Sequence, residues 1–236
     1  METPSGLINV WAQGDWVARG VLLLLLAMSV ASWLVIVSKL TDLLRLRRIA
    51  RAVEPFWACA DLAQGLRLLG EGDESPFRSL AEAGQAAVDH HARTKGQLAD
   101  GLDASEWITR GLRNAVDASS TRLQSGLAIL ASVGSTAPFI GLFGTVWGIY
   151  HALMGIAAAG QATIDRVAGP VGEALIMTAL GLAVAIPAVL GYNALVRGNR
   201  AIVAQLQRFA HDLHAYFITG ARTAQTPSGA SGDRGR

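Results

Sequence analysis

Charged residues are scarce in this chain. Only 16% of its 236 residues are Asp, Glu, Lys or Arg, whereas hydrophobic residues make up 51%. Soluble domains carry about 25% charged residues, so the composition predicts an integral membrane protein. The formal net charge is only +2, and the basic residues do not gather with aromatic residues in one patch. The chain therefore lacks the features expected of a nucleic-acid-binding protein.

Cysteine is nearly absent as well. Cys59 is the only one, which excludes an intrachain disulfide and a metal site built from several cysteines. The sequence offers no Ser–His–Asp set, no His/Asp/Glu cluster with metal-ligand spacing and no His/Met pair suited to haem. The GLFGT segment at 141–145 lacks the Lys that a phosphate-binding loop requires. We therefore expect neither an enzyme nor a protein with a bound cofactor or metal.

Long hydrophobic segments are what the chain has in abundance. Three of them, at 17–39, within 123–158 and at 170–196, reach the roughly 20 residues needed to span a bilayer. Residues 1–16 contain no Lys or Arg, so the first segment lacks the positive region of a signal peptide. We expect an uncleaved anchor, preceded by a short extracytoplasmic segment at 1–16.

The basic residues predict the orientation of these spans. After the first span come Lys39, Arg45, Arg47, Arg48 and Arg51, and after the third come Arg197, Arg200, Arg208 and Arg222. Because cytoplasmic segments are rich in Lys and Arg, the N-terminus is expected outside and the C-terminus inside. The turn at 159–169 is then extracytoplasmic.

The cytoplasmic parts are expected to be helical. Residues 40–122 carry apolar residues at helical spacing, interrupted by GEGDESP at 70–76, and the pattern resumes at 197–221. The apolar faces comprise Leu43, Leu46, Ile49, Val53, Phe56 and Trp57, then Ile108, Leu112, Ala115 and Val116, and finally Ile202, Leu206, Phe209, Leu213 and Phe217. The second membrane helix is predicted to run over 123–158 with its first part in the cytoplasm. The Gly- and Ser-rich tail at 222–236 is predicted to be disordered.

Glu173 is the only charged residue between Arg166 and Arg197. A carboxylate at membrane depth costs several kcal/mol, so such residues usually mark an ion path or a buried partner. The alternative is an interfacial glutamate that reaches the headgroups. Thr178 lies about 140° around an ideal helix from Glu173, so the two do not stack directly. His151 is expected near the outer interface beside aromatic residues, with a proton-relay role as the lesser alternative.

Small residues form a stripe along the second span. Gly134, Gly141, Gly148 and Gly155 recur every seven residues, and Gly144 joins them. Small residues at this spacing let another helix approach closely, so a helix-packing face is predicted. The alternative is that glycine is simply common in membrane helices. Thr145 shares this stripe and is therefore the more interesting of the intramembrane threonines.

Two long motifs resemble the ExbB/TolQ/MotA proton-channel family. They are ASVGSTAPFIGLFGTVWGIYHAL at 131–153 and AGPVGEALIMTALGLAVAIPAVLGYN at 168–193. The FAHDLH segment at 209–214 is similar to the tail of the ExbB branch rather than the TolQ branch. MotA relatives have four spans, whereas three are predicted here. By motif, Glu173 in GEAL corresponds to the family's pore glutamate, while Thr145 in FGTVWG and Thr178 in IMTAL correspond to pore-lining threonines.

The resemblance also implies an assembly and a function. Members form a homopentameric ring of mostly helical subunits in the bacterial inner membrane, with a dimer of the single-span protein ExbD in the central pore. Proton flow then energises TonB, which drives outer-membrane receptors for iron–siderophore complexes and similar cargo. The proton is the coupling ion, and the partner's membrane aspartate is its main carrier. The short N-terminal segment departs from some members. A TolQ-type motor for envelope integrity and a non-conducting membrane scaffold are the alternatives.

Overall fold

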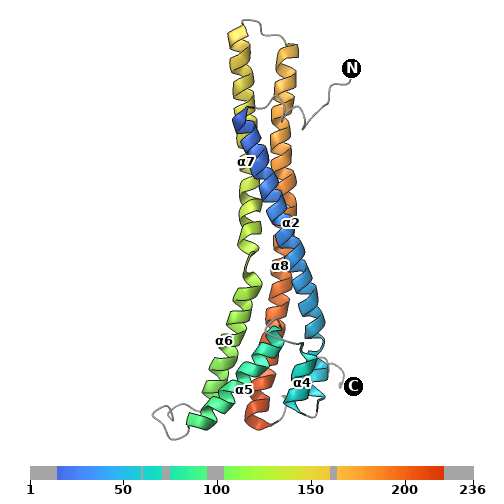
Figure 1. Ribbon diagram of the computed structural model, residues 1–236, viewed down its shortest axis with the longest axis vertical. Coiled ribbons are helices and arrows are strands. Elements are labelled where there is room, and N and C mark those ends of the chain that lie inside the picture. Colours follow the sequence, from blue (N-terminus) through green and yellow to red (C-terminus); the bar gives the residue numbers. More distant parts are fainter. Residues whose placement is uncertain (1–14, 60, 71–74, 95–103, 160–163, 221–236) are drawn as a thin grey trace, which may run out of the picture. The chain divides into compact units, whose positions relative to one another are not determined.

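The described part of the chain is α-helical. The computed structural model describes residues 15–59, 61–70, 75–94, 104–159 and 164–220, and all of the regular structure within these ranges consists of helices (Figure 1). The predicted all-α class is confirmed. The chain divides into two compact units. The first unit comprises residues 1–43 and 124–198, and the second unit comprises residues 44–123 and 199–236.

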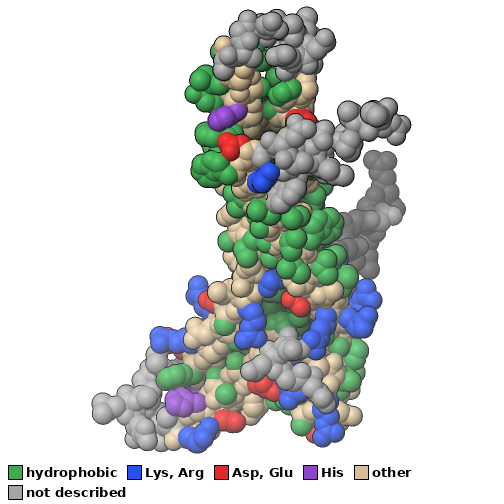
Figure 2. Space-filling model, turned by 45° about the horizontal axis from the view of Figure 1, so that its top comes forward, with side chains coloured by type: hydrophobic (Ala, Val, Ile, Leu, Met, Phe, Trp, Pro, Cys, Tyr) green, Lys and Arg blue, Asp and Glu red, His purple; other side chains and the backbone are tan. Residues whose placement is uncertain are grey.

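Among the described residues, three helices are long and apolar enough to cross a membrane. They are α2 (Trp16–Ala50), α7 (Leu127–Ala159) and α8 (Ile164–Thr219), and they contribute the regular structure of the first unit. Large apolar side chains on all three are exposed, among them Leu34, Phe139 and Leu190. Figure 2 shows many hydrophobic side chains, interspersed with backbone and other side chains, on one face of the molecule. Helices that are apolar on every side suit a membrane rather than water.

Within the first unit, α7 and α8 pack antiparallel. Gly134 of α7 lies against Val189 of α8, while Gly148, further along α7, lies against Ala174, which comes earlier in α8. Helix α2 instead runs parallel to α8, since Ile36 lies against Gly191 and Leu43 against Gly198.

The predicted helix over 123–158 is interrupted near its start. Helix α6 (Ala104–Gln124) ends two residues before α7 begins at Leu127. Gly126 between them has φ +83°, a left-handed conformation that glycine adopts without steric cost and that commonly ends helices. The cytoplasmic extension of the second span is therefore a separate helix. In the second unit, Asn199 Nδ2 donates a 2.7 Å hydrogen bond to the Leu123 carbonyl, one of the carbonyls left unpaired at the end of α6.

The other helix boundaries also differ from the predicted ones. Helix α8 begins at Ile164 rather than at 170, and it continues without interruption past Pro170 and Pro187 to Thr219. The predicted turn thus shortens, and the third span and cytoplasmic helix are one element. Helix α2 likewise continues past 39 to Ala50. The predicted N-terminal segment up to residue 14 and the predicted tail at 222–236 lie outside the described residues.

The second unit has a conventional hydrophobic core. It adds α3 (Val53–Trp57), α4 (Leu62–Leu68) and α5 (Pro76–Thr94) to α6 and the last part of α8. Phe209 packs edge-on against Phe56, with ring centroids 5.2 Å apart. The predicted apolar faces supply much of the core, since buried residues include Leu46, Phe56, Ile108, Leu112, Val116, Ile202, Leu206, Phe209 and Leu213.

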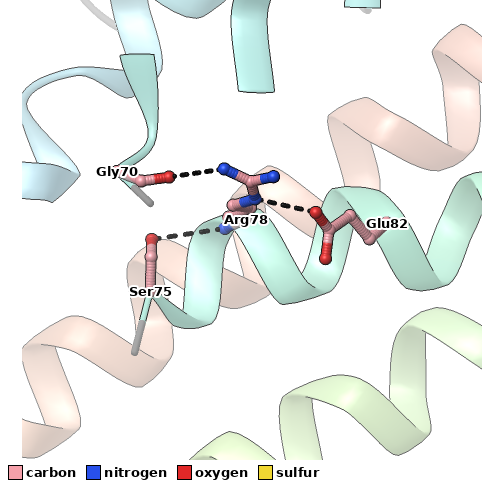
Figure 3. A network of polar contacts seen from close by, with 4 residues as sticks. All are labelled: Gly70, Ser75, Arg78 and Glu82. Carbon is pink, nitrogen blue, oxygen red and sulfur yellow. Dashed lines mark hydrogen bonds and ion pairs between the residues drawn. The ribbon is translucent and has the colours of Figure 1, made fainter. Parts of the chain in front are cut away.

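A polar network fixes the start of α5 (Figure 3). The Ser75 hydroxyl accepts a hydrogen bond from the Arg78 backbone N–H at 3.4 Å, with Pro76 at the first helical position, as is usual for an N-cap. The Arg78 side chain donates to the Gly70 carbonyl at 3.0 Å and to Glu82 Oε1 at 2.7 Å. These contacts connect α5 to the residue where the predicted break at 70–76 begins.

Candidate functional site

Two threonine hydroxyls meet between α7 and α8. The Oγ1 atoms of Thr145 and Thr178 lie 2.5 Å apart. Thr145 is only 5% exposed, and small neighbours permit the approach, because Gly141 and Gly148 lie one turn away on the same helix. The two threonines singled out from the sequence are therefore brought together within one chain.

The donors and acceptors around this pair define its polarity. Thr145 Oγ1 also lies 3.2 Å from the Gly141 carbonyl and 3.1 Å from the Ala174 carbonyl. A carbonyl can only accept, so the single Thr145 proton is directed to these oxygens. When Thr145 donates to one of these carbonyls, Thr178 donates its own proton to Thr145. The hydrogen bonds then run from Thr178 in α8 to Thr145 in α7 and end at a backbone carbonyl.

Other hydroxyls on α7 behave differently. Ser135 and Thr136 both donate to the Ser132 carbonyl, at 3.0 and 2.7 Å. This back-bonding within a helix is the common arrangement for Ser and Thr in apolar helices. Thr145 is distinguished by its contacts across to a second helix.

Glu173 lines a separate pocket at one end of the first unit. Its side chain is half-buried, and no group in the described part of the chain donates a hydrogen bond to its carboxylate. The pocket has a volume of about 200 Å³, and its wall includes Asp15, Trp147, His151, Glu173 and Met177. The three titratable residues come from different parts of the unit: Asp15 precedes α2, His151 lies in α7 and Glu173 lies in α8.

Asp15 and His151 face each other at the pocket. Asp15 Oδ1 accepts a 2.7 Å hydrogen bond from the Trp16 N–H at the start of α2. Its second oxygen, Oδ2, lies 3.9 Å from His151 Nε2, and both side chains are almost half exposed, at 41% and 45%. The pairing is therefore water-accessible, and a surface pair of this kind contributes at most about 1 kcal/mol to stability.

The predicted glycine stripe lies mainly against α8. A methyl group placed on Gly141 would come 2.6 Å from the Met177 carbonyl oxygen and 3.0 Å from the Gly181 Cα, so backbone meets backbone there. Equivalent groups on Gly134, Gly144 and Gly148 would lie 2.5 to 3.1 Å from side-chain atoms of α8. Gly155 differs, since no atom of the described residues lies within 4 Å of such a group.

Distances along α8 separate the hydroxyl pair from the carboxylate. At 1.5 Å per residue, Thr178 lies about 28 Å and Glu173 about 36 Å from Arg197. A hydrocarbon layer of about 30 Å that began at Arg197 would contain the hydroxyl pair and end short of Glu173. Trp16, Trp147 and Tyr150 lie near the Glu173 end, and such aromatic residues are typical of the membrane–water interface.

Sequence patterns identified part of this arrangement. Glu173 and Thr178, predicted not to stack, have different neighbours: Thr178 contacts Thr145, and Glu173 lines the pocket. Asp15 was missed, and His151 was assigned mainly to the aromatic belt. Asp15 and His151 could have been placed beside Glu173 only from the register of α2 and α7 against α8, and the pattern of a single helix does not reveal that register.

Known proteins are similar to this chain in sequence. Residues 75–208 match the model of the MotA/TolQ/ExbB proton channel family. The chain is similar to the biopolymer transport protein ExbB of Xanthomonas campestris pv. campestris, with 49% identity over 89% of this chain and 85% of the relative. It is 42% identical to the biopolymer transport protein ExbB of Neisseria meningitidis, over 89% of this chain and 96% of the relative. The Tol-Pal system protein TolQ of Pseudomonas aeruginosa is 35% identical, over 84% and 87%.

Proposed function

The chain belongs to the MotA/TolQ/ExbB proton channel family, and we propose that it is the inner-membrane subunit of a proton-driven motor. With an ExbD partner, it uses the proton motive force to energise TonB and thereby outer-membrane uptake of iron–siderophore complexes and similar cargo. Its N-terminus faces the periplasm and its C-terminus the cytoplasm. The proton is the coupling ion.

The hydroxyl pair is the observation that carries this proposal. Thr145 and Thr178 are joined at 2.5 Å inside an apolar helix pair, where a polar group is costly without a partner or a function. Glu173 follows about 8 Å further along α8 at 1.5 Å per residue. These are the titratable and hydroxyl groups that a proton path along the helix pair requires.

One chain does not supply a complete path, because Glu173 is the only carboxylate of α8 between the pocket and Arg197. Five copies in a ring would place several such residues around a pore that holds an ExbD dimer. The apolar side chains exposed on α2, α7 and α8 are available for contacts between copies and with lipid. Native mass spectrometry of the complex in mild detergent should give five copies per particle; a fully active monomer would contradict the ring.

The available energy suits such a motor. Each proton that crosses 100 mV releases about 2.3 kcal/mol. This is enough to change the ratio of two conformations of a partner about fiftyfold at 25 °C. A few protons per step would therefore drive a rotation or rocking of the partner within the ring.

Glu173→Gln tests the proton-coupling role. The change keeps the shape of the side chain and removes its ionisation, so we expect siderophore-dependent growth and proton flux to fall at least about tenfold at normal expression. Glu82→Gln is the matched control, since Glu82 lies in the second unit in an exposed ion pair with Arg78. Growth that survives Glu173→Gln unchanged would refute the coupling role.

A TolQ-type motor is the second candidate, favoured by the 35% identity to the Pseudomonas aeruginosa TolQ. The identities to proteins named ExbB are higher, at 42% and 49%, and we therefore prefer uptake. Complementation distinguishes the two: the gene should restore iron-limited growth to a strain without ExbB and leave the detergent sensitivity of a strain without TolQ largely uncorrected. A non-conducting scaffold predicts no proton flux in vesicles that contain the whole complex.

A further inference from the structure

We propose that Asp15, His151 and Glu173 form a proton-loading site in the first unit, beside the start of α2. In this site His151 takes a proton from hydronium, which becomes water, and passes it to the Glu173 carboxylate. The proposal rests on the proposed proton-channel function and adds to it the group by which protons enter. It draws on residues from before α2, from α7 and from α8 that line one pocket.

The tautomer of His151 leaves the required atom free. Its Nδ1 lies 3.1 Å from the Trp147 carbonyl. Because a carbonyl only accepts hydrogen bonds, Nδ1 carries the proton in the neutral ring. Nε2 is then the unprotonated nitrogen, and it is the atom that faces Asp15 Oδ2 at 3.9 Å. A proton from water therefore binds at Nε2, on the side of the ring that is paired with a carboxylate.

A carboxylate and an aromatic ring lie against the imidazole. The Asp15 carboxylate supplies an opposite charge, and it is held in place because its other oxygen caps α2. The Trp147 ring lies 4.5 Å from the imidazole, centroid to centroid, within the distance at which an aromatic ring attracts a cation. Both Asp15 and His151 are nearly half exposed, so the ring exchanges protons with bulk water.

Glu173 is the acceptor on the same pocket. It is half-buried, and within the described residues its carboxylate has no hydrogen-bond donor that would compete for it. The pocket volume of about 200 Å³ accommodates several waters at about 30 Å³ each. The Nε2–H bond breaks as an O–H bond forms on Glu173, with waters in the pocket relaying the proton between the two residues. The imidazole returns to its neutral state and Glu173 becomes neutral.

Other charges near the site are few. In the described part of the chain, Asp15, His151 and Glu173 are the titratable residues in the pocket wall. Arg19, one turn along α2, is exposed, and its backbone N–H bonds to the Asp15 carbonyl. The site thus combines one base with two carboxylates, an arrangement that attracts protons from the outer solution.

Proton flux into vesicles tests the proposal. The whole complex is reconstituted in phosphatidylethanolamine–phosphatidylglycerol vesicles with a pH-sensitive dye inside, and flux is driven by a potassium diffusion potential at several outer pH values. We expect His151→Gln to lower the flux about tenfold at pH 7.5 and less than about twofold at pH 5.5, where hydronium reaches Glu173 without a relay. Asp15→Asn should show a weaker effect of the same form. His211→Gln, which changes an exposed histidine of the second unit, is the matched control.

The outcomes separate the two proposals. Absence of flux in the wild-type complex, or unchanged flux in Glu173→Gln, would refute the channel function itself. Loss of flux in Glu173→Gln with an unchanged pH profile in His151→Gln would leave the channel function standing and overturn the loading site.

A second measurement does not depend on flux. Nitrogen-15 NMR of the histidine-labelled complex, with the His151 signal assigned from its loss in His151→Gln, reports ring protonation directly. Glu173→Gln and Asp15→Asn should each shift the Nε2 resonance of His151 at a fixed pH, because each replaces a carboxylate in the wall of the pocket that this nitrogen faces. A resonance that neither change moves would overturn the proposed site.

Discussion

At the scale of single residues, the molecule separates two polar features that the sequence places close together. The hydroxyl pair lies between α7 and α8, with Thr145 buried, whereas Glu173 borders a water-accessible pocket with His151 and Asp15. The pair is suited to holding a fixed hydrogen-bond direction, and the pocket is suited to exchange with solvent. A proton path would need both properties, at different depths.

Thr178→Val tests the role of the pair. Valine keeps the shape of threonine but removes the donor to Thr145, and the expected cost in unfolding free energy is only about 1 kcal/mol. We expect proton flux and siderophore-dependent growth to fall by about tenfold or more even though the complex still assembles.

Thr136→Val is the matched control for this change. Its hydroxyl bonds only to Ser132 on its own helix, so flux should stay near the wild-type value. An equal loss in both variants would indicate that any change of hydroxyl on these helices is harmful, and the pair would have no special role.

The sequence permitted part of this site to be foreseen. Thr145 and Thr178 could be named because they share motifs and a small-residue face. Their 2.5 Å contact depends on the register of two antiparallel helices, which is set by glycines on both. The pocket was out of reach for the same reason: Asp15 and His151 come from elements more than 100 residues apart.

At the scale of helices, the contact between α7 and α8 is built on glycine. Gly141 and Gly181 face each other, and a methyl group on either would meet backbone atoms of the partner helix at 2.6 to 3.0 Å. Backbone cannot move aside as a side chain can. The Gly141–Gly181 contact therefore sets the register of α7 against α8, and with it the position at which Thr145, one turn after Gly141, meets Thr178.

Gly141→Ala and Gly155→Ala should act in opposite directions. Alanine gains about 1 kcal/mol over glycine in a helix, and at Gly155 no described atom opposes it. At Gly141 the overpacking cost of about 1–3 kcal/mol against backbone exceeds that gain. We expect the thermal unfolding midpoint in detergent to fall for Gly141→Ala and to stay or rise slightly for Gly155→Ala.

Assembly should follow the same order. Gly141→Leu should reduce the amount of intact complex on blue-native gels before it reduces membrane insertion. A stable complex with unchanged unfolding in both Gly141 variants would contradict the packing role.

Helix identities followed from periodicity, whereas helix ends did not. The apolar faces of α6 and of the end of α8 were predicted because their buried residues recur at helical spacing. The break at Gly126 was missed, since one glycine in a glycine-rich segment gives no sign of its positive φ. The third span was predicted to begin at 170, yet Pro170 lies within α8, which begins at Ile164.

At the scale of the whole molecule, the two units present different surfaces. The first unit exposes large apolar side chains, and the second unit buries Phe56, Phe77 and Phe209 in a core of its own. This contrast fits one unit in lipid and the other in water. The proposed orientation places the second unit in the cytoplasm.

Cys59 offers a direct measurement of that orientation. It is the only cysteine in the chain and lies partly exposed between α3 and α4 in the second unit. A membrane-impermeant maleimide should label it in inside-out vesicles and leave it unlabelled in intact spheroplasts. Ala157→Cys in a Cys59→Ser background should give the reverse result, because Ala157 is exposed near the end of α7. Labelling of Cys59 in spheroplasts would invert the proposed topology.

The polarity of the threonine pair has a consequence for energy conservation. A proton that hops from Thr178 to Thr145 would be passed on to a backbone carbonyl, and the hydrogen bonds of this pair offer no further group to receive it. In the described arrangement the pair therefore insulates rather than conducts. Both hydroxyls would have to turn over, with α8 moving relative to α7, before a charge could pass. A subunit in this arrangement would not let protons leak across the membrane, and protons would pass only after α7 and α8 shift.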